Sequence, residues 1–470
     1  MEFKQEELSE PVSPTGQYLN SPVLSISIIG VLELEVPIDD SPTMALLKDV
    51  FLPINPRFSS IMVRDENGVK HWKRVEVKPM DHVKFPTFPA EKSVEFYDEY
   101  LNDYISKIAM DEFPQSRPLW EIHIIKYPTT NAAGTLIFKL HHSLGDGYSL
   151  MGALLSCLQR ADNPSLPLTF PKLQTNATNL GGESGSIFTS VPRFFSGLVN
   201  TVSDFGWSLL KSTVVEDDRT PIRSGDAGME FRPITITTMT FSLDRIKQIK
   251  TDLRVSINDV ITGTIFYGTQ LYMQQASCDE LRNAHSTALV LLNTRNIAGY
   301  KSVDEMVMKP QTVTKYWGNQ FAFLHVPIPE LNETDSSDPI CFIYKAHQMI
   351  KKKRNSGAVY LTGRLLETLR KLIGPERTAR YMYGTIKNSS MALTNMIGPV
   401  EQMALSNHPV RSFYFMVVGV PLSLTITMVS YTGKLRVAVG TKKGLIDPQR
   451  FKSCIEKAFD MMFNAEVKSA

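Results

Sequence analysis

The residue types best suited to chemistry cluster in one short stretch, His141-His142-Ser143-Leu144-Gly145-Asp146-Gly147. A neutral histidine accepts a proton near physiological pH, because its ordinary pKa is about 6.5. A neutral His142 could therefore take a proton from an alcohol as that oxygen attacks an acyl carbonyl. The alternative interpretation is a buried structural histidine beside an Asp-Gly turn.

The residues before this stretch predict the element that positions it. Residues 134–142 read as a strand whose period of two places Leu136, Phe138, Leu140 and His142 on one face. Gly145 and Gly147 then break the strand, and residues 148–160 form a mostly apolar helix. His142 is therefore expected at the end of a buried strand, where it can face a cavity.

Asp146 has two possible roles. Its carboxylate could orient the imidazole of His142 directly, as in a catalytic triad. It could instead pair with a distant arginine and hold the turn in shape. The tight turn between the two residues favours the second role.

The sequence offers no obvious covalent nucleophile. It has no Gly-x-Ser-x-Gly elbow, and its four cysteines are far apart at positions 157, 278, 341 and 454. The cysteines suggest neither a disulfide framework nor a zinc site, and the histidines show no zinc-ligand spacing. Direct transfer without a covalent acyl-enzyme is therefore expected, with no cofactor and no metal.

Length and composition indicate a globular protein of two domains. The chain has 470 residues, and 43% of them are hydrophobic. Its formal net charge of +2 does not indicate a nucleic-acid-binding protein. We expect an N-terminal domain over 1–165, a crossover linker over 166–214 and a C-terminal domain over 215–470. Mixed strands and helices predict an α/β fold with two similar domains around a shared channel. The oligomeric state cannot be derived from the sequence.

Several further elements are expected from periodicity and end signals. Ser256 and Asp259 resemble a capping box before the apolar run at 260–272, and Asp447-Pro448 begins a closing helix. The other expected strands are 23–32, 288–292, 413–420 and a hairpin over 423–439, and the other expected helices are 44–52 and 95–109.

Residues 187–210 form an apolar stripe at helical spacing, interrupted by Arg193 and Asp204. A spanning helix needs about 20 predominantly apolar residues with few charges, so spanning is the least favoured interpretation. The alternatives are an amphipathic helix that packs on the core and one that lies in a membrane interface.

The sequence resembles the plant wax ester synthase/diacylglycerol acyltransferases, within the superfamily of CoA-dependent acyltransferases that includes chloramphenicol acetyltransferase and peptide-synthetase condensation domains. Residues 141–147 match the His-His-x-x-x-Asp-Gly motif of that superfamily. The other matching blocks, in order, are Pro118-Leu119-Trp120, Asn258-Asp259-Val260, Asn293-Thr294-Arg295, Gly318-Asn319 with Val326-Pro327-Ile328-Pro329, and Thr394-Asn395-Met396-Ile397-Gly398-Pro399, where Thr394 replaces the family's serine.

The resemblance implies two chloramphenicol-acetyltransferase-like domains and transfer of a long acyl chain from acyl-CoA, a co-substrate, to a fatty alcohol, to diacylglycerol or to both. His142 would be the general base, and Asp146 would be structural and paired with Arg295. Thr394 or Asn395 would donate to the oxyanion. Structural support is implied for His141, Gly147, Arg295, Asn258 and Asn319.

The resemblance also implies a membrane surface as partner, at the endoplasmic reticulum or the plasma membrane, with the active site facing the cytosol. The cations at 351–354 could meet anionic lipid or CoA phosphates, although such runs are commonly solvated helix faces. Two other functions stay open: a superfamily acyltransferase with a soluble acceptor, and a non-catalytic lipid-binding protein. Chain-length preference and the ratio of wax ester to triacylglycerol cannot be derived from the sequence.

Overall fold

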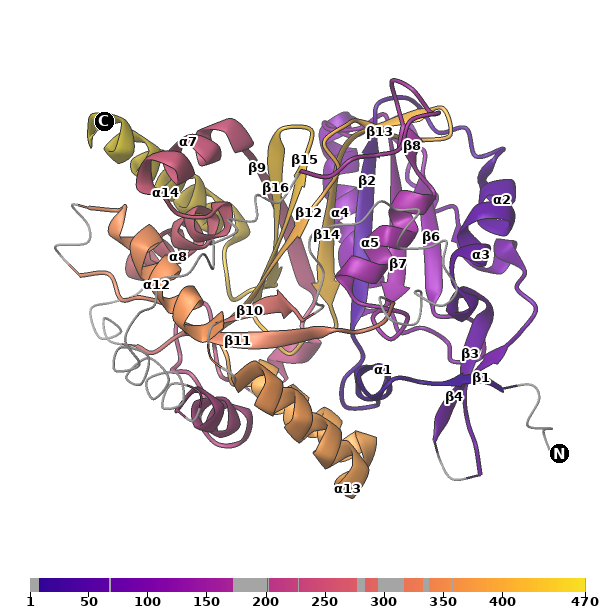
Figure 1. The fold of residues 1–470 in the computed structure, drawn as a ribbon. Helices are drawn as coiled ribbons and strands as arrows, with labels where there is room; N and C mark the ends of the chain where they lie inside the picture. Colours follow the sequence, from indigo (N-terminus) through magenta and orange to yellow (C-terminus); the bar gives the residue numbers. More distant parts are fainter. Residues whose placement is uncertain are drawn as a thin grey trace, which may run out of the picture.

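Two large β-sheets lie side by side and carry helices on their outer faces (Figure 1). This computed structural model describes residues 8–66, 69–171, 201, 203–226, 228–276, 284–294, 317–332, 338–354, 356 and 358–469. One large sheet has seven strands and the other has six, and a three-stranded sheet lies near the N-terminus. The fold is therefore α/β with mixed sheets, as expected.

The strands, in chain order, are β1 (Leu8–Pro11), β2 (Ser27–Leu34), β3 (Ser60–Arg64), β4 (Lys70–Arg74), β5 (Val83–Lys84), β6 (Trp120–Ile125), β7 (Gly134–His141), β8 (Gln159–Arg160), β9 (Ile234–Ser242), β10 (Thr287–Asn293), β11 (Phe321–Pro327), β12 (Met391–Ile397), β13 (Met403–Leu405), β14 (His408–Val418), β15 (Leu424–Tyr431) and β16 (Lys434–Lys442). The helices are α1 (Pro14–Leu19), α2 (Thr43–Leu46), α3 (Leu52–Ile54), α4 (Val94–Met110), α5 (Gly147–Ser156), α7 (Leu243–Leu253), α8 (Ile257–Ala276), α12 (Cys341–Arg354), α13 (Ala358–Lys387) and α14 (Pro448–Ser469).

The seven-stranded sheet contains strands from both ends of the chain. Its order is β5-β6-β7-β2-β14-β13-β8, and β14 pairs antiparallel with β2 from Val410 opposite Leu34 to Val418 opposite Ser27. Residues 403–418, expected in a C-terminal domain over 215–470, thus complete the sheet of the N-terminal half. The expected limits at 165 and 214 do not separate the two sheets, because strand pairing depends on complementary faces and not on contiguity in sequence.

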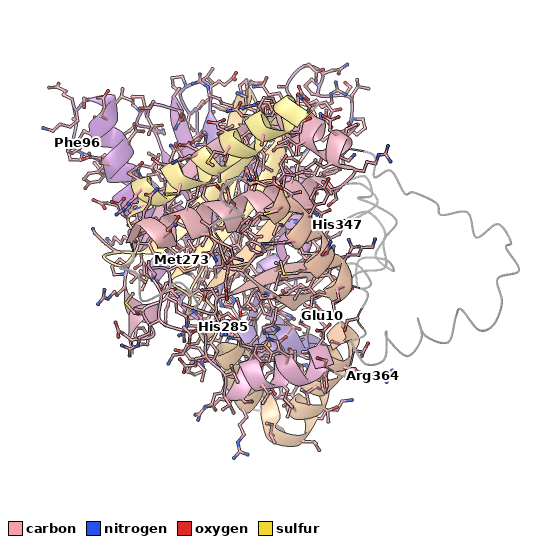
Figure 2. The ribbon with its side chains drawn as sticks, turned by 90° about the vertical axis from the view of Figure 1, so that its left-hand side faces the viewer. Glu10, Phe96, Met273, His285, His347 and Arg364 are labelled. Atoms are coloured by element: carbon pink, nitrogen blue, oxygen red, sulfur yellow. The ribbon has the colours of Figure 1, made fainter. Side chains whose placement is uncertain are left out.

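The six-stranded sheet has the order β11-β10-β12-β15-β16-β9 and is covered on its outer face by helices. Helices α7, α12 and α14 pack against α8, and α14 also contacts β9. Figure 2 looks onto this helical face, with Met273 on α8 and His347 on α12. The largest apolar cluster joins these helices to the sheet.

The two faces of the seven-stranded sheet pack differently. Alternate residues of β7, among them Leu136, Phe138 and Leu140, join α5 and the fully buried Trp120 in one apolar cluster. Ile137 points the other way, into a cluster with α4 and residues of β9 and β16 from the second sheet. The predicted period of two in β7 is therefore confirmed, and its second face meets the other sheet.

Several predicted elements are confirmed near their expected ends, including α4, β7, the β15–β16 hairpin and the capping box, in which the Ser256 amide donates to Asp259 at 2.8 Å. The helix expected at 44–52 is instead split into α2, a π-helical turn at Leu47–Phe51 and α3. Pro53 has no N–H to continue the regular ladder. The helix after the motif ends at Ser156, because residues 159–160 pair with β13.

The predicted helix over 187–210 lies mostly outside the described residues, and only its last part can be placed. Residues 203–213 are helical. Lys353 donates to Asp204 at 2.6 Å, and the hydroxyl of Thr385 on α13 donates to that of Ser212 at 2.6 Å. This segment is therefore bound to α12 and α13. In the part of the chain that the structure describes, no helix combines the length and apolarity that crossing a membrane requires.

Candidate active site

His142 follows the last residue of β7 and lies where the two sheets meet. Its main-chain N–H donates to the carbonyl of Ile26 at 2.9 Å, and its side chain is buried. Its ring lies edge-on to Phe321, the first residue of β11 in the other sheet, with 5.4 Å between centroids. The predicted base is thus held by one sheet and enclosed by the other.

Burial sets the protonation state of His142. Removal from water lowers its pKa below the ordinary histidine value, while the charge of Asp146 and a hydrogen bond with Asn319 act in the opposite direction. The ring is therefore neutral at physiological pH. Its Nδ1 lies 2.8 Å from Oδ1 of Asn319, and this is the one hydrogen bond that the ring makes within the described residues, so Nε2 is left without a partner there.

His141 faces the opposite side of the sheet. Its Nδ1 accepts the main-chain N–H of Ser143 at 3.1 Å, and its Nε2 lies 3.2 Å from the hydroxyl of Ser25. Burial lowers its pKa to about 3. His141 therefore stays neutral and contacts the turn through Ser143, and its supporting role stays a prediction.

The carboxylate of Asp146 is occupied by backbone and hydroxyl donors. Its Oδ1 accepts the main-chain N–H and the hydroxyl of Ser149, both at 3.1 Å, which caps the N-terminus of α5. Its Oδ2 accepts the main-chain N–H of Gln320 at 2.9 Å. The predicted partner Arg295 lies outside the described residues, so that pairing stays a prediction.

Residues 317–320, which lead into β11, form several hydrogen bonds with the turn after β7. The indole N–H of Trp317 donates to the carbonyl of Leu144 at 2.8 Å, and the Gly318 N–H donates to the hydroxyl of Ser149 at 3.0 Å. Gly318 has a φ of +119°, which favours glycine. Asn319, expected as structural support, donates from Nδ2 to the main-chain carbonyl of His142 at 2.9 Å.

The two candidate oxyanion donors lie on opposite faces of β12. Asn395 donates to the side-chain oxygen of Asn258 at 2.6 Å, on the face covered by α8. Thr394 shares the other face with Met396, whose sulfur lies against Gly147 at the start of α5. Within the described residues, the Thr394 hydroxyl makes no hydrogen bond, and the pleat of β12 places it on the same face as Met396.

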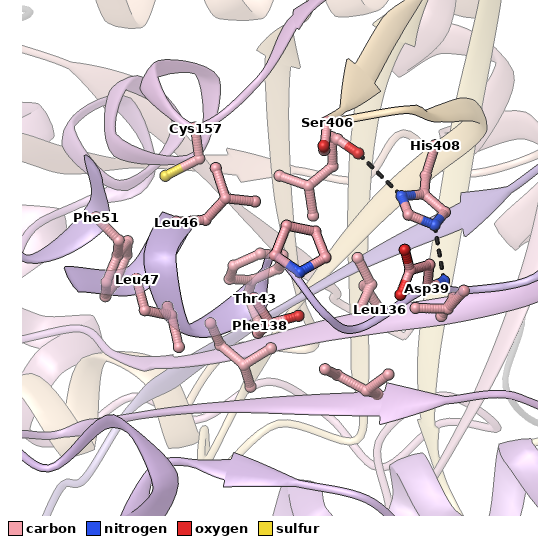
Figure 3. A pocket seen from close by; sticks show the side chains of 15 residues that line it. Asp39, Thr43, Leu46, Leu47, Phe51, Leu136, Phe138, Cys157, Ser406 and His408 are labelled. Carbon is pink, nitrogen blue, oxygen red and sulfur yellow. Dashed lines mark hydrogen bonds between the residues drawn. The ribbon is translucent and has the colours of Figure 1, made fainter. Parts of the chain in front are cut away.

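Two cavities lie on the two faces of the seven-stranded sheet. One of about 390 Å³ is lined by Ser25 and Phe113, which both contact His141. The other, of about 40 Å³, is lined by Leu136 and Phe138 of β7 (Figure 3). The lining of the first combines apolar side chains with Asp111, Glu112 and Lys442, and of these two cavities it alone has the volume for a hydrocarbon chain.

Sequence reasoning missed four residues that shape the turn: Ser25, Ser149, Trp317 and Gln320. Trp317 and Gln320 flank the recognised Gly318-Asn319 pair, so the contact could have been suspected from that block. Ser25 contacts His141 from a distant part of the chain, and no local pattern signals that contact. Within the described residues, no group of three or more His, Cys, Asp or Glu side chains is placed to hold a metal ion.

Comparisons with known proteins agree with this geometry. The profile of the wax ester synthase/diacylglycerol acyltransferase catalytic domain matches residues 50–261, and that of the WS/DGAT C-terminal domain matches residues 317–463. The chain belongs to the wax ester synthase/diacylglycerol acyltransferase family. This is a family of acyl-CoA-dependent O-acyltransferases, as the sequence motifs predicted.

Similar proteins cover nearly the whole chain. Wax ester synthase/diacylglycerol acyltransferase 4 of Arabidopsis thaliana is 29% identical, over 95% of this chain and 88% of its own length. Wax ester synthase/diacylglycerol acyltransferase 11 of Arabidopsis thaliana is also 29% identical, over 95% of this chain and 92% of its own length. The similarity to this family therefore extends over nearly the whole chain.

Solved structures confirm the fold. The wax ester synthase/diacylglycerol acyltransferase from Marinobacter aquaeolei VT8 aligns with a TM-score of 0.60 at 15% identity, over 97% of this chain and 99% of that one. The first condensation domain of the CDA synthetase aligns with a TM-score of 0.53 at 11% identity, over 94% of this chain and 90% of that one. The expected two-lobed acyltransferase fold is thus confirmed.

Proposed function

We propose that this protein transfers a long acyl chain from acyl-CoA to a fatty alcohol, to diacylglycerol or to both, with His142 as the general base. The observation that carries the proposal is a buried neutral imidazole between the two sheets, with Nε2 unpartnered within the described residues. Such a ring can accept the hydroxyl proton while the oxygen attacks the thioester carbon. A pure lipid-binding protein has no need of a base at this position.

The reaction then forms one C–O bond, breaks one C–S bond and transfers the proton from His142 to the leaving group. The acceptor oxygen forms the new C–O bond, and the tetrahedral intermediate collapses with cleavage of the C–S bond. The CoA thiolate leaves and takes the proton back from the His142 imidazolium. No covalent acyl-enzyme is formed.

Two neighbouring residues support this step. The Thr394 hydroxyl is the proposed oxyanion donor, because it shares a face of β12 with Met396, which lies against Gly147, whereas Asn395 faces Asn258 on α8. Asp146 has a structural role, because its oxygens accept from Ser149 and Gln320 and hold the turn. Its charge also favours the imidazolium that forms during the reaction.

The cavity of about 390 Å³ favours a lipid acceptor over a soluble one. Its lining includes Phe113, Met416 and Leu422, and it lies beside His141, which precedes the proposed base on the opposite face of β7. A small polar acceptor would leave the apolar part of this lining uncovered. A soluble acceptor stays the second candidate function, because Ser25, Ser27 and Thr425 also line the cavity.

A membrane surface is part of the proposal, at the endoplasmic reticulum or the plasma membrane with the site facing the cytosol. The substrates partition into bilayers. Exposed apolar side chains occur at Trp207, Val214 and Leu372. Of the cation run at 351–354, Lys353 is paired with Asp204, so only the remaining cations are available to lipid headgroups or CoA phosphates.

The test is an acyltransferase assay with labelled palmitoyl-CoA, offered hexadecanol and diacylglycerol separately. The wild-type chain is compared with His142→Ala and with His285→Ala, an exposed histidine that Figure 2 labels. We expect ester from at least one acceptor, full activity in His285→Ala, and a loss of about a hundredfold or more in folded His142→Ala. Activity in His142→Ala near the wild-type level would refute His142 as the base.

A further inference from the structure

We propose that Asn319 fixes the tautomer of His142, so that Nε2 is always the basic nitrogen. The proposal rests on the proposed function, since it concerns how the general base is prepared. Asn319 makes two hydrogen bonds with one residue. Its Nδ2 donates to the main-chain carbonyl of His142 at 2.9 Å, and its Oδ1 lies 2.8 Å from Nδ1 of the ring.

The first bond fixes the orientation of the amide. A carbonyl oxygen can only accept, so the NH₂ group of Asn319 must face the carbonyl of His142. The reverse orientation would bring two oxygens together and lose both bonds. Oδ1 is therefore the atom that faces the ring.

The second bond then fixes the proton on the ring. Oδ1 of an amide has no proton to give, so Nδ1 must donate. In a neutral imidazole only one nitrogen carries a proton, and Nε2 is left with its lone pair. Asn319 thus performs the orienting role that a carboxylate has in a triad.

The surroundings explain why Asn319 and not Asp146 takes this role. Both oxygens of Asp146 are occupied by Ser149 and Gln320. The neighbours of Asn319 are anchored to the same turn, because Gly318 donates to Ser149 and Gln320 donates to Asp146. The amide therefore cannot drift away from His142 without breaking several other bonds.

A neutral amide has a further consequence for the pKa of the base. The hydrogen bond with Asn319 raises the pKa of His142, but less than an adjacent full charge would, and burial keeps the net pKa below the ordinary value. Replacing the amide by a carboxylate would favour the imidazolium, so more of the base would be protonated at neutral pH.

The experiment compares Asn319→Ala, the isosteric Asn319→Asp, and the exposed Asn163→Ala as a control, with folding checked by thermal unfolding. For folded Asn319→Ala we expect kcat to fall about a hundredfold with little change in KM, because the ring loses its orientation and tautomer. For Asn319→Asp we expect the acidic limb of the pH–rate profile to move to higher pH. Asn163→Ala should match the wild type.

A merely structural Asn319 would give a different result. Both variants would then lose folded protein, and the folded fraction would keep the wild-type pH profile. Wild-type kcat in Asn319→Ala, or an unmoved acidic limb in Asn319→Asp, would overturn the proposal. His142→Ala is measured in parallel. If His142→Ala stays active, the assignment of His142 as the base fails. If His142→Ala is inactive and the Asn319 variants behave like the wild type, only the role of Asn319 fails.

Discussion

The main-chain amide of Gln320 donates to the carboxylate of Asp146 at 2.9 Å, across the boundary between the two sheets. Asp146 belongs to the turn after β7, and Gln320 immediately precedes β11 of the other sheet. The aspartate of the His-His-x-x-x-Asp-Gly motif therefore joins the two halves of the molecule. Its second oxygen caps α5, so one side chain fixes the turn from both directions.

Asp146→Asn should lower stability as well as rate. The amide has only one acceptor oxygen, so its NH₂ group must face either the Ser149 N–H or the Gln320 N–H. We expect a loss of about 1–3 kcal/mol in the free energy of unfolding, measured with urea. Asp103→Asn, on the exposed face of α4, is the control and should be neutral. A fully stable but inactive Asp146→Asn would indicate a direct catalytic role.

The pH dependence of transfer should report His142. Burial lowers its pKa, so the base stays unprotonated until the pH falls below the ordinary value of 6.5. We expect the acidic limb of kcat/KM below pH 6.5, and at still lower pH in folded Asp146→Asn, because the charge of Asp146 raises this pKa. An acidic limb above pH 6.5 in the wild type would contradict a buried neutral base.

Local patterns predicted the elements of the fold well, and long-range pairing less well. The strand before His142, the hairpin at 424–442 and the helix after Asp447 were predicted because periodicity and capping are local properties. The position of β14 was not predicted. Its apolar face fits either sheet, and only complementarity with β2 decides which it joins.

The candidate site likewise combines residues that local spacing predicts with contacts that depend on distant parts of the chain. His142 and Asp146 were found from spacing alone, since they share one turn. Asn319 was named from the family resemblance, but its contact with the ring depends on a segment 177 residues away. Thr394 and Asn395 are adjacent in sequence, and only the pleat of β12 shows that they face opposite ways.

Thr394 offers a test of oxyanion stabilisation that keeps side-chain volume constant. Thr394→Val replaces the hydroxyl by a methyl group of similar size, and we expect kcat to fall about 10²–10³-fold if that hydroxyl donates to the developing charge. Thr394→Ser keeps the donor and should retain most of the activity. Steady-state kinetics at saturating acyl-CoA separate the two variants. Equal activity of the valine and serine variants would exclude this role.

Acid should destabilise the fold through its buried histidines. Burial lowers the pKa of His141 to about 3 and those of His123 and His325 to about 4. The unfolded chain therefore binds protons that the folded chain excludes, so stability is full above about pH 6.5 and decreases below it. Urea titrations should show a slope of up to about 1.4 kcal/mol per pH unit for each histidine. His123→Gln should reduce the slope of the free energy of unfolding against pH below pH 6.5. A slope equal to that of the wild type would contradict this prediction.

The buried pair of Lys211 and Asp217 should hold the segment after residue 203 to the second sheet. Both side chains are almost fully buried, and Asp217 also accepts from Thr287 and Ser390. Lys211→Met would leave the carboxylate without its cation, and we expect a loss of about 3–5 kcal/mol. Lys247→Met, in an exposed pair with Asp244, should cost under about 1 kcal/mol. Similar losses in the two variants, measured by urea unfolding, would show that the buried pair does not hold this segment.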